Sequence, residues 1–85
     1  MASELIVGSP GWVRAYGNQL RVIIGSTELF AYSSDAPSNC ATVSSDTLKL
    51  YGSLAQGSLL SGKVIGVSYE SCGGQNMIIS VELSK

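Results

Sequence analysis

The fold is decided by the segment Ser45–Gly62, whose sequence is SDTLKLYGSLAQGSLLSG. Ser44, Ser45 and Asp46 offer side-chain oxygens to the free amides of a first helical turn, and Gly62 suits the positive φ just past a last turn. Apolar residues recur between these ends at three- and four-residue steps and form one stripe: Leu48, Tyr51, Ala55 and Leu59, widened by Leu50 and Leu54. The segment is the only predicted helix of the chain, and we expect it to be buried over more than half of its circumference.

Two glycines lie inside this predicted helix, at Gly52 and Gly57. Each costs about 1 kcal/mol relative to alanine, so the helix is held by packing rather than by propensity. Either the glycines let another backbone come close, or the helix lies against a neighbouring subunit.

The segments on both sides of the helix alternate like strands. They are Glu4–Val7, interrupted by Gly8–Gly11 and resumed by Trp12–Tyr16, then Leu20–Ile24, Glu28–Tyr32, Lys63–Glu70 and Met77–Leu83. Gly17–Asn18 and Gly73–Asn76 predict turns, and Ser33–Asn39 predicts a loop. In the last strand, four apolar residues are predicted on one face, opposite Ser80 and Glu82: Met77, Ile79, Val81 and Leu83.

With the interrupted first segment counted as one strand, the order is three strands, one helix and two strands. This order predicts a single, mainly β domain over residues 1–85, a five-stranded OB-like barrel with its helix between the third and fourth strands. The alternative is a twisted antiparallel sheet with the helix laid across one face.

The composition predicts self-association. The chain has 85 residues, of which 45% are hydrophobic and 13% are charged, whereas ordinary domains carry about 25% charged residues. A chain this short buries only about 60% of its unfolded surface. We therefore expect part of the folded surface to be covered by other copies of the chain.

The two cysteines, Cys40 and Cys72, predict the compartment. An even count in a short chain is typical of an oxidised, secreted or periplasmic protein with a disulfide; the alternative is two separate buried thiols in a cytosolic protein. Residues 1–4 have none of the features of a signal peptide, and no apolar run is long enough to span a membrane.

One resemblance extends beyond these patterns. The segments Leu50–Ala55 and Ser61–Tyr69, followed by a cysteine, resemble the core of the receptor-binding B subunits of AB5 toxins in the subtilase-cytotoxin and pertussis-like group, and related small exported bacterial proteins of unknown function. Ser3–Gly8 is similar to the opening strand of that group. The resemblance implies an OB fold, a ring of five subunits, glycan binding without catalysis, and a possible A subunit as partner.

The chain departs from those toxin subunits in two places. It lacks the N-terminal polar segment that supplies part of their sugar pocket, and the aromatic–proline insertion after the fourth strand. No sugar-binding residue is therefore carried over from the family.

The residues do not predict an enzyme. The chain has no histidine, and its six acidic residues are isolated in the sequence. A Gly-x-Ser-x-Gly elbow and a phosphate-binding glycine loop are both absent. Two sulfurs without histidine cannot complete a metal site within one chain. The five basic residues are scattered, which argues against a nucleic-acid partner. We expect no catalytic residue, cofactor or metal.

Two groups of residues are candidates for ligand binding. Trp12, Arg14 and Tyr16 share one face of a predicted strand, where a ring could stack on a sugar and a guanidinium could bind a carboxylate. Alternatively, the rings pack against the helix or a neighbouring subunit. The second group lies where a strand passes into a loop and could equally be ordinary polar loop: Tyr32, Ser33 and Asp35.

These observations favour a non-catalytic exported protein that binds a glycan or another cell-surface receptor as a homo-oligomer, with a pentamer favoured. The alternative is a small exported structural or inhibitory module that binds a protein partner, for example through a strand added at its open edge.

Overall fold

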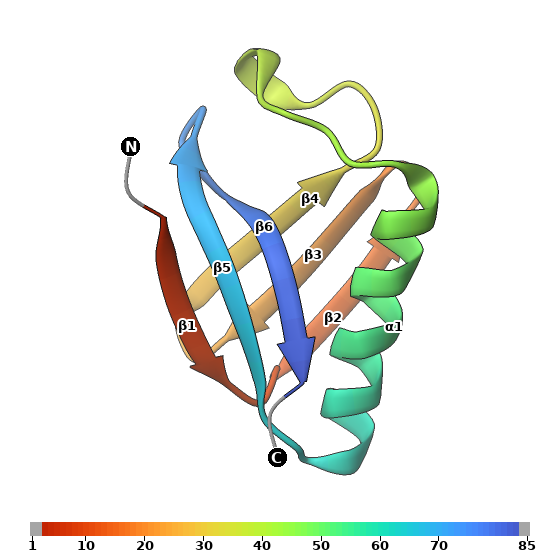
Figure 1. The fold of residues 1–85 in the computed structure, drawn as a ribbon, viewed down its shortest axis with the longest axis vertical. Helices are drawn as coiled ribbons and strands as arrows, with labels where there is room; N and C mark the ends of the chain where they lie inside the picture. Colours follow the sequence, from red (N-terminus) through yellow and green to blue (C-terminus); the bar gives the residue numbers. More distant parts are fainter. Residues whose placement is uncertain (1–2, 84–85) are drawn as a thin grey trace.

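A computed structural model describes residues 3–83 of the chain (Figure 1). It is mainly β with one α-helix, and its elements follow in this order: β1 (Glu4–Gly8), β2 (Trp12–Tyr16), β3 (Gln19–Ile24), β4 (Thr27–Tyr32), the short 3-10 turn η1 (Pro37–Asn39), α1 (Ser45–Ser61), β5 (Ile65–Cys72) and β6 (Gln75–Leu83). Within these residues, no helix is long and apolar enough to cross a membrane.

The six strands form one open sheet in the order β1-β5-β6-β4-β3-β2. All neighbouring strands are antiparallel except β4 and β6, which meet in a short parallel pair at Phe30 and Met77. Figure 1 shows the sheet curled, so that β1, β5 and β6 pass in front of β2, β3 and β4, with α1 running beside β2. The core lies between the two halves and the helix.

The predicted five-stranded barrel is wrong in its strand count, its element order and its closure, because four strands rather than three precede the helix and the sheet is open. The segment Gly8–Gly11 separates β1 from β2 completely: β1 pairs with β5 and β2 with β3, at opposite edges of the sheet. Proline has no backbone N–H for a ladder, so Pro10 favours this break. Gly8 is the last residue of β1, and a Cβ atom there would lie 2.9 Å from Cγ2 of the buried Ile24, so this close approach favours glycine.

The structure confirms both predicted ends of the helix. The Ser44 hydroxyl accepts a hydrogen bond from the Thr47 N–H at 3.1 Å, and Gly62, with φ of 73°, donates its N–H to the Ser58 carbonyl. The predicted stripe is correct for its first three residues and wrong at Leu59, which is 38% exposed. The next buried position is Ser58, whose hydroxyl donates to the Lys63 carbonyl.

The two leucines expected to widen the stripe also differ from the prediction. Leu50 is 56% exposed and Leu54 is half-buried, so the helix buries a narrower face than its apolar content indicates. A Cβ atom added to Gly52 would lie at an ordinary contact distance, 3.5 Å, from Cδ1 of Leu20, whereas the Cβ position of Gly57 faces open space. Close packing within the chain therefore requires neither glycine.

A bulge in β6 overturns the predicted alternation of that strand. Ser68 pairs with Ser80 and Tyr69 with Ile78, which leaves Ile79 as an extra residue. Ile78 therefore points into the core, while Ile79 is 45% exposed. The Ile79 carbonyl accepts a hydrogen bond from the Tyr51 hydroxyl at 2.7 Å. The side chain of Leu83 lies outside the described part of the chain.

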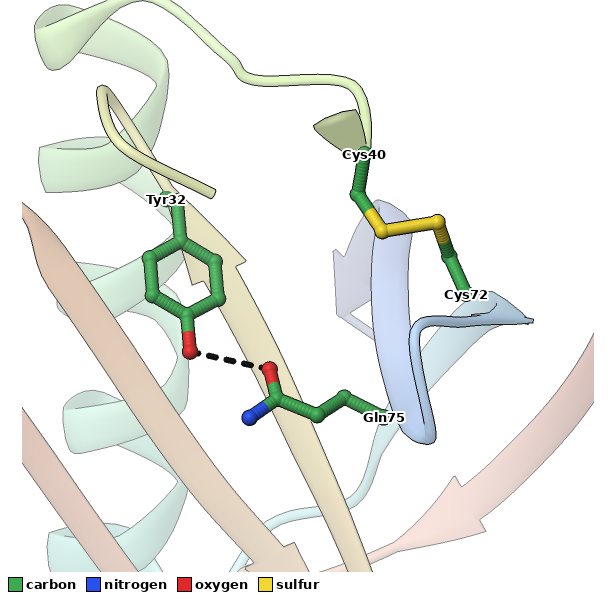
Figure 2. Close-up of a disulfide and its surroundings, with 4 residues drawn as sticks. All are labelled: Tyr32, Cys40, Cys72 and Gln75. Atoms are coloured by element: carbon green, nitrogen blue, oxygen red, sulfur yellow. Dashed lines mark hydrogen bonds between the residues drawn. A yellow bond between two sulfur atoms is a disulfide. The ribbon is translucent and has the colours of Figure 1, made fainter. Parts of the chain in front are cut away.

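The disulfide is confirmed. Cys40 and Cys72 are bonded, with their Cα atoms 6.1 Å apart, and Figure 2 shows the bond joining the segment after β4 to the β5–β6 hairpin. A loop of this length stabilises the fold by about 4 kcal/mol in the chain-entropy treatment. The intramolecular bond is compatible with a protein outside the cytoplasm.

Candidate functional site

The first candidate group lies on the face of the sheet that turns away from the helix. Val13 and Ala15 of β2 face α1, so the alternating residues Trp12, Arg14 and Tyr16 face outward. The same alternation in β3 and β4 buries one set of side chains and leaves the other set half-buried, with Glu28 exposed. We call the outward set the arginine face: Trp12, Arg14, Tyr16, Gln19, Arg21 and Phe30.

Arginines and aromatic rings are layered on the arginine face. The guanidinium carbon of Arg14 lies 5.0 Å from the centre of the Tyr16 ring. That of Arg21 lies 5.2 Å from the Trp12 ring and 5.4 Å from the Phe30 ring. Cation–π contacts of this kind hold the flexible arginine stems in place. Trp12 and Tyr16 therefore pack against arginines, not against the helix.

Positive charge is in excess on this face. Arg14 and Arg21 lie directly opposite each other on neighbouring strands, where like charges repel. Arg21 pairs with Glu28, in the only salt bridge among residues 3–83. Its Nε atom is buried and has no hydrogen-bond partner there. Glu28 thus pairs with Arg21 alone, and Arg14 forms no salt bridge within residues 3–83.

A hollow of about 230 Å³ lies between these side chains, lined by Arg14, Tyr16, Gln19 and Arg21. Its wall offers guanidinium N–H groups, the Gln19 amide and the phenol ring of Tyr16. Guanidinium groups bind carboxylates through two parallel hydrogen bonds, and the ring can stack on an apolar face of a ligand. The hollow, which we call the arginine hollow, suits a small anionic group.

The second candidate group is only partly brought to this face. Tyr32 lies opposite Gln19, which donates to the Tyr32 hydroxyl at 3.4 Å. That hydroxyl donates to Oε1 of Gln75 at 2.9 Å (Figure 2). Tyr32 therefore extends the polar row that starts at Tyr16 and Gln19.

Ser33 and Asp35 lie beyond the end of β4 and outside this row. The Ser33 N–H donates to the Asn18 carbonyl at 2.9 Å, which ties the start of the loop to the β2–β3 turn. Asp35 is exposed and has a φ of 55°. The structure thus separates these two residues from the arginine hollow.

The sequence interpretation missed Arg21 and Gln19. The available signal was the two-residue turn Gly17–Asn18, because such a turn fixes which residues face each other across the hairpin. Counting outward from it places Tyr16 opposite Gln19 and Arg14 opposite Arg21, as the register shows.

A second, larger hollow lies farther along the outer side, with a volume of about 490 Å³. It is lined mainly by polar groups: Ser26, Thr27, Glu28, Phe30, Tyr69, Gly74, Gln75 and Asn76. A hydrogen bond with Glu4, together with burial and the Glu4 charge, raises the pKa of Tyr69. Its phenol is therefore a neutral hydrogen-bonding group near neutral pH.

Among the residues described, no three histidine, cysteine or acidic side chains gather in a group that could hold a metal ion. No family model, curated protein or solved structure matches the chain.

Proposed function

We propose that the chain is a non-catalytic, exported receptor-binding protein that binds a carboxylate-bearing glycan at the arginine hollow. One observation carries this proposal: Arg14 and Arg21 lie opposite each other beside an aromatic ring and a hollow, and the only carboxylate paired with either of them among residues 3–83, that of Glu28, contacts Arg21 from the neighbouring strand β4. An anionic ligand would relieve the repulsion between the two arginines and pair with Arg14, which forms no salt bridge in the described part of the chain.

The neighbouring side chains support a sugar rather than a simple inorganic anion. Tyr16 is 62% exposed and presents a ring beside the hollow. Gln19 lies beside the polar row that leads to Tyr32 and Gln75. Hydroxyl groups of a sugar match these amides and phenols, while its carboxylate matches the guanidinium groups.

The proposal includes assembly of several copies, with a ring of five favoured by the resemblance to AB5 toxin B subunits and an A subunit as possible partner. Exposed apolar side chains support self-association. Leu5 and Val7 of the edge strand β1 are 59% and 57% exposed, and Leu60 of α1 is 80% exposed. Exposed apolar surface of this kind often marks contacts between proteins.

An open OB-like sheet also belongs to this proposal. If β1 and β2 are counted together as one bent first strand, β3, β4, β5 and β6 become the second, third, fourth and fifth strands. The order across the sheet, read from β2 to β1, is then 1-2-3-5-4-1. The helix between β4 and β5 then lies between the third and fourth strands. This order supports an OB-like topology whose two edges stay free for partners.

Glycan binding is tested with sialyllactose and lactose, which differ by one acidic sugar, titrated into the isotope-labelled protein. We expect sialyllactose to shift the amide signals of β2 and β3, and lactose to leave them unchanged. Arg14→Gln should weaken sialyllactose binding about tenfold or more, because it removes a charge-assisted contact. Lys63→Gln removes the same charge elsewhere and should bind like the wild type.

Equal binding of the two sugars, or equal weakening by both substitutions, would contradict an anionic site at Arg14. Assembly is measured separately by native mass spectrometry, where we expect a fivefold mass. A single-chain mass at every concentration would remove the ring without affecting the glycan site.

A further inference from the structure

A second site, on the opposite side of β2 from the arginine face, has the features of a peptide-binding groove. Strand β2 is an edge strand, and only one of its sides is paired within the described residues, to β3. An edge strand presents a row of unpaired N–H and C=O groups to which another extended chain can add.

The groove lies between this edge strand and the helix. It has a volume of about 330 Å³, and Figure 1 shows β2 and α1 side by side. Its apolar part is Val13, Ala15, Leu20 and Leu48, and its polar rim is Gln19, Lys49, Ser53 and Gln56, with Gly17 and Gly52 completing the lining. We call this the β2–α1 groove.

Gly52 keeps the groove open. The nearest atom to its missing Cβ is Cδ1 of Leu20 at 3.5 Å, so a side chain here would project beside the groove floor without a backbone clash. Glycine within a helix costs about 1 kcal/mol relative to alanine. This loss of helix stability at Gly52 has an explanation if the space beside the helix is occupied by side chains of a partner.

The charge of the lining indicates the chemistry of that partner. Lys49 is the only charged residue among those that line the groove. It lies near the start of α1, which Figure 1 shows beside the end of β2. A partner with a carboxylate at this end would be complementary to the groove, whereas a basic partner would be repelled.

Strand β1 of a second copy does not fit the groove. The side chain of Ile6 in β1 already packs against the core of its own chain, and Gly8 has no side chain. A β1 strand that continued the sheet past β2 with its core-facing side toward the groove would bring only Ile6, which is already packed, while its exposed Leu5 and Val7 would face the other side of the sheet. The groove needs an extended segment that has no core of its own.

We infer that the β2–α1 groove binds an extended peptide of a protein partner, which adds to the free edge of β2. Its alternate, small apolar side chains enter the groove, and a carboxylate pairs with Lys49. The two sites lie on opposite faces of β2 and share Gln19, whereas Lys49 lines only the groove and Arg14 only the arginine hollow, so substitutions at these two residues distinguish the peptide from the glycan.

The probe is a short capped peptide that alternates valine with threonine and has aspartate at both ends, titrated into the isotope-labelled protein. We expect the amide signals of β2 and of Lys49–Gln56 to shift in a saturable way. Lys49→Gln should weaken binding about two- to fivefold, the range of an exposed ion pair. It should have no effect on the same peptide with asparagine at both ends.

Gly52→Met blocks the groove with a good helix former, so it should fold and bind the peptide about tenfold or more weakly. The matched control is Gly57→Met on the same helix, where nothing lies within 4 Å of the added Cβ. Equal binding by both variants would overturn the inference, as would signals that shift only outside β2 and α1. If Gly52→Met instead dissociates a wild-type oligomer, the groove holds a second copy and the inference is wrong.

Discussion

The β2–β3 and β5–β6 hairpins both close with a two-residue turn, yet only the first keeps its register to the end. From Gly17–Asn18, residues pair without interruption out to Trp12 and Ile23. From Gly73–Gly74, the pairing slips at Ile79. Both hairpins contact the helix, but the regular one carries most of the arginine face, while the bulged one carries the disulfide and the hydrogen bond from Tyr51.

The two halves of the sheet also differ in charge. The charged residues of β2, β3 and β4 are Arg14, Arg21 and Glu28, whereas those of β1, β5 and β6 are all acidic: Glu4, Glu70 and Glu82. The regular half thus concentrates the positive charge that an anionic ligand needs. The bulged half is held by contacts to other parts of the chain.

The largest expected effect is loss of the disulfide, which anchors the tip of the bulged hairpin. Replacing both cysteines, Cys40→Ser with Cys72→Ser, should lower the free energy of unfolding by about 2–5 kcal/mol. Chemical denaturation with and without reductant measures this. Reductant should destabilise the wild type alone, and an unchanged unfolding midpoint in the variant would contradict a structural role for the bond.

The next effect is at the bulge itself, where the Tyr51 hydroxyl binds the Ile79 carbonyl. Tyr51→Phe leaves that carbonyl without its partner and should cost about 1–3 kcal/mol. The matched control is Tyr16→Phe on the arginine face, where the exposed hydroxyl makes no hydrogen bond among the described residues and the cost should be near zero. Equal costs would show that the bulge does not depend on Tyr51.

The same residue predicts a pH dependence. Burial raises the pKa of Tyr51 from its usual value of 10.0. The unfolded chain therefore loses this proton first, and the stability from Tyr51 is complete below pH 10 and declines as the pH rises through the folded-state value. Tyr51→Phe should show less of this alkaline loss than the wild type.

The contrast between the hairpins explains how much of the fold follows from the sequence. The helix ends follow from Ser44 and Gly62, and the β2–β3 register follows from Gly17–Asn18, because these signals are local. The bulge has no such signal, because the sequence of Met77–Val81 allows either Ile78 or Ile79 to face the core. Only packing against the core and the hydrogen bond from Tyr51 select one of the two. The same holds for Gly8, whose need for glycine comes from distant Ile24.

The candidate site divides in the same way. The common face of Trp12, Arg14 and Tyr16 follows from strand alternation, and Arg21 could have been added from the turn. The separation of Asp35 from this face, and the β2–α1 groove, depend on how the loop and helix pack in three dimensions. No local pattern contains that information.

The smallest effect concerns the two arginines of the regular hairpin, which differ in their partners. Arg21 contacts two rings and Glu28, so Arg21→Gln should cost about 1–2 kcal/mol. Arg14 contacts one ring, which stabilises the fold, and faces the charge of Arg21, which destabilises it. Because these two effects oppose each other, Arg14→Gln should change the free energy of unfolding by less than about 0.5 kcal/mol. Added salt distinguishes the repulsion between the two arginines from the ring contact, because it screens the repulsion. Added salt should therefore stabilise the wild type more than Arg14→Gln in urea unfolding, and an equal response would mean that the two charges do not oppose each other on this face.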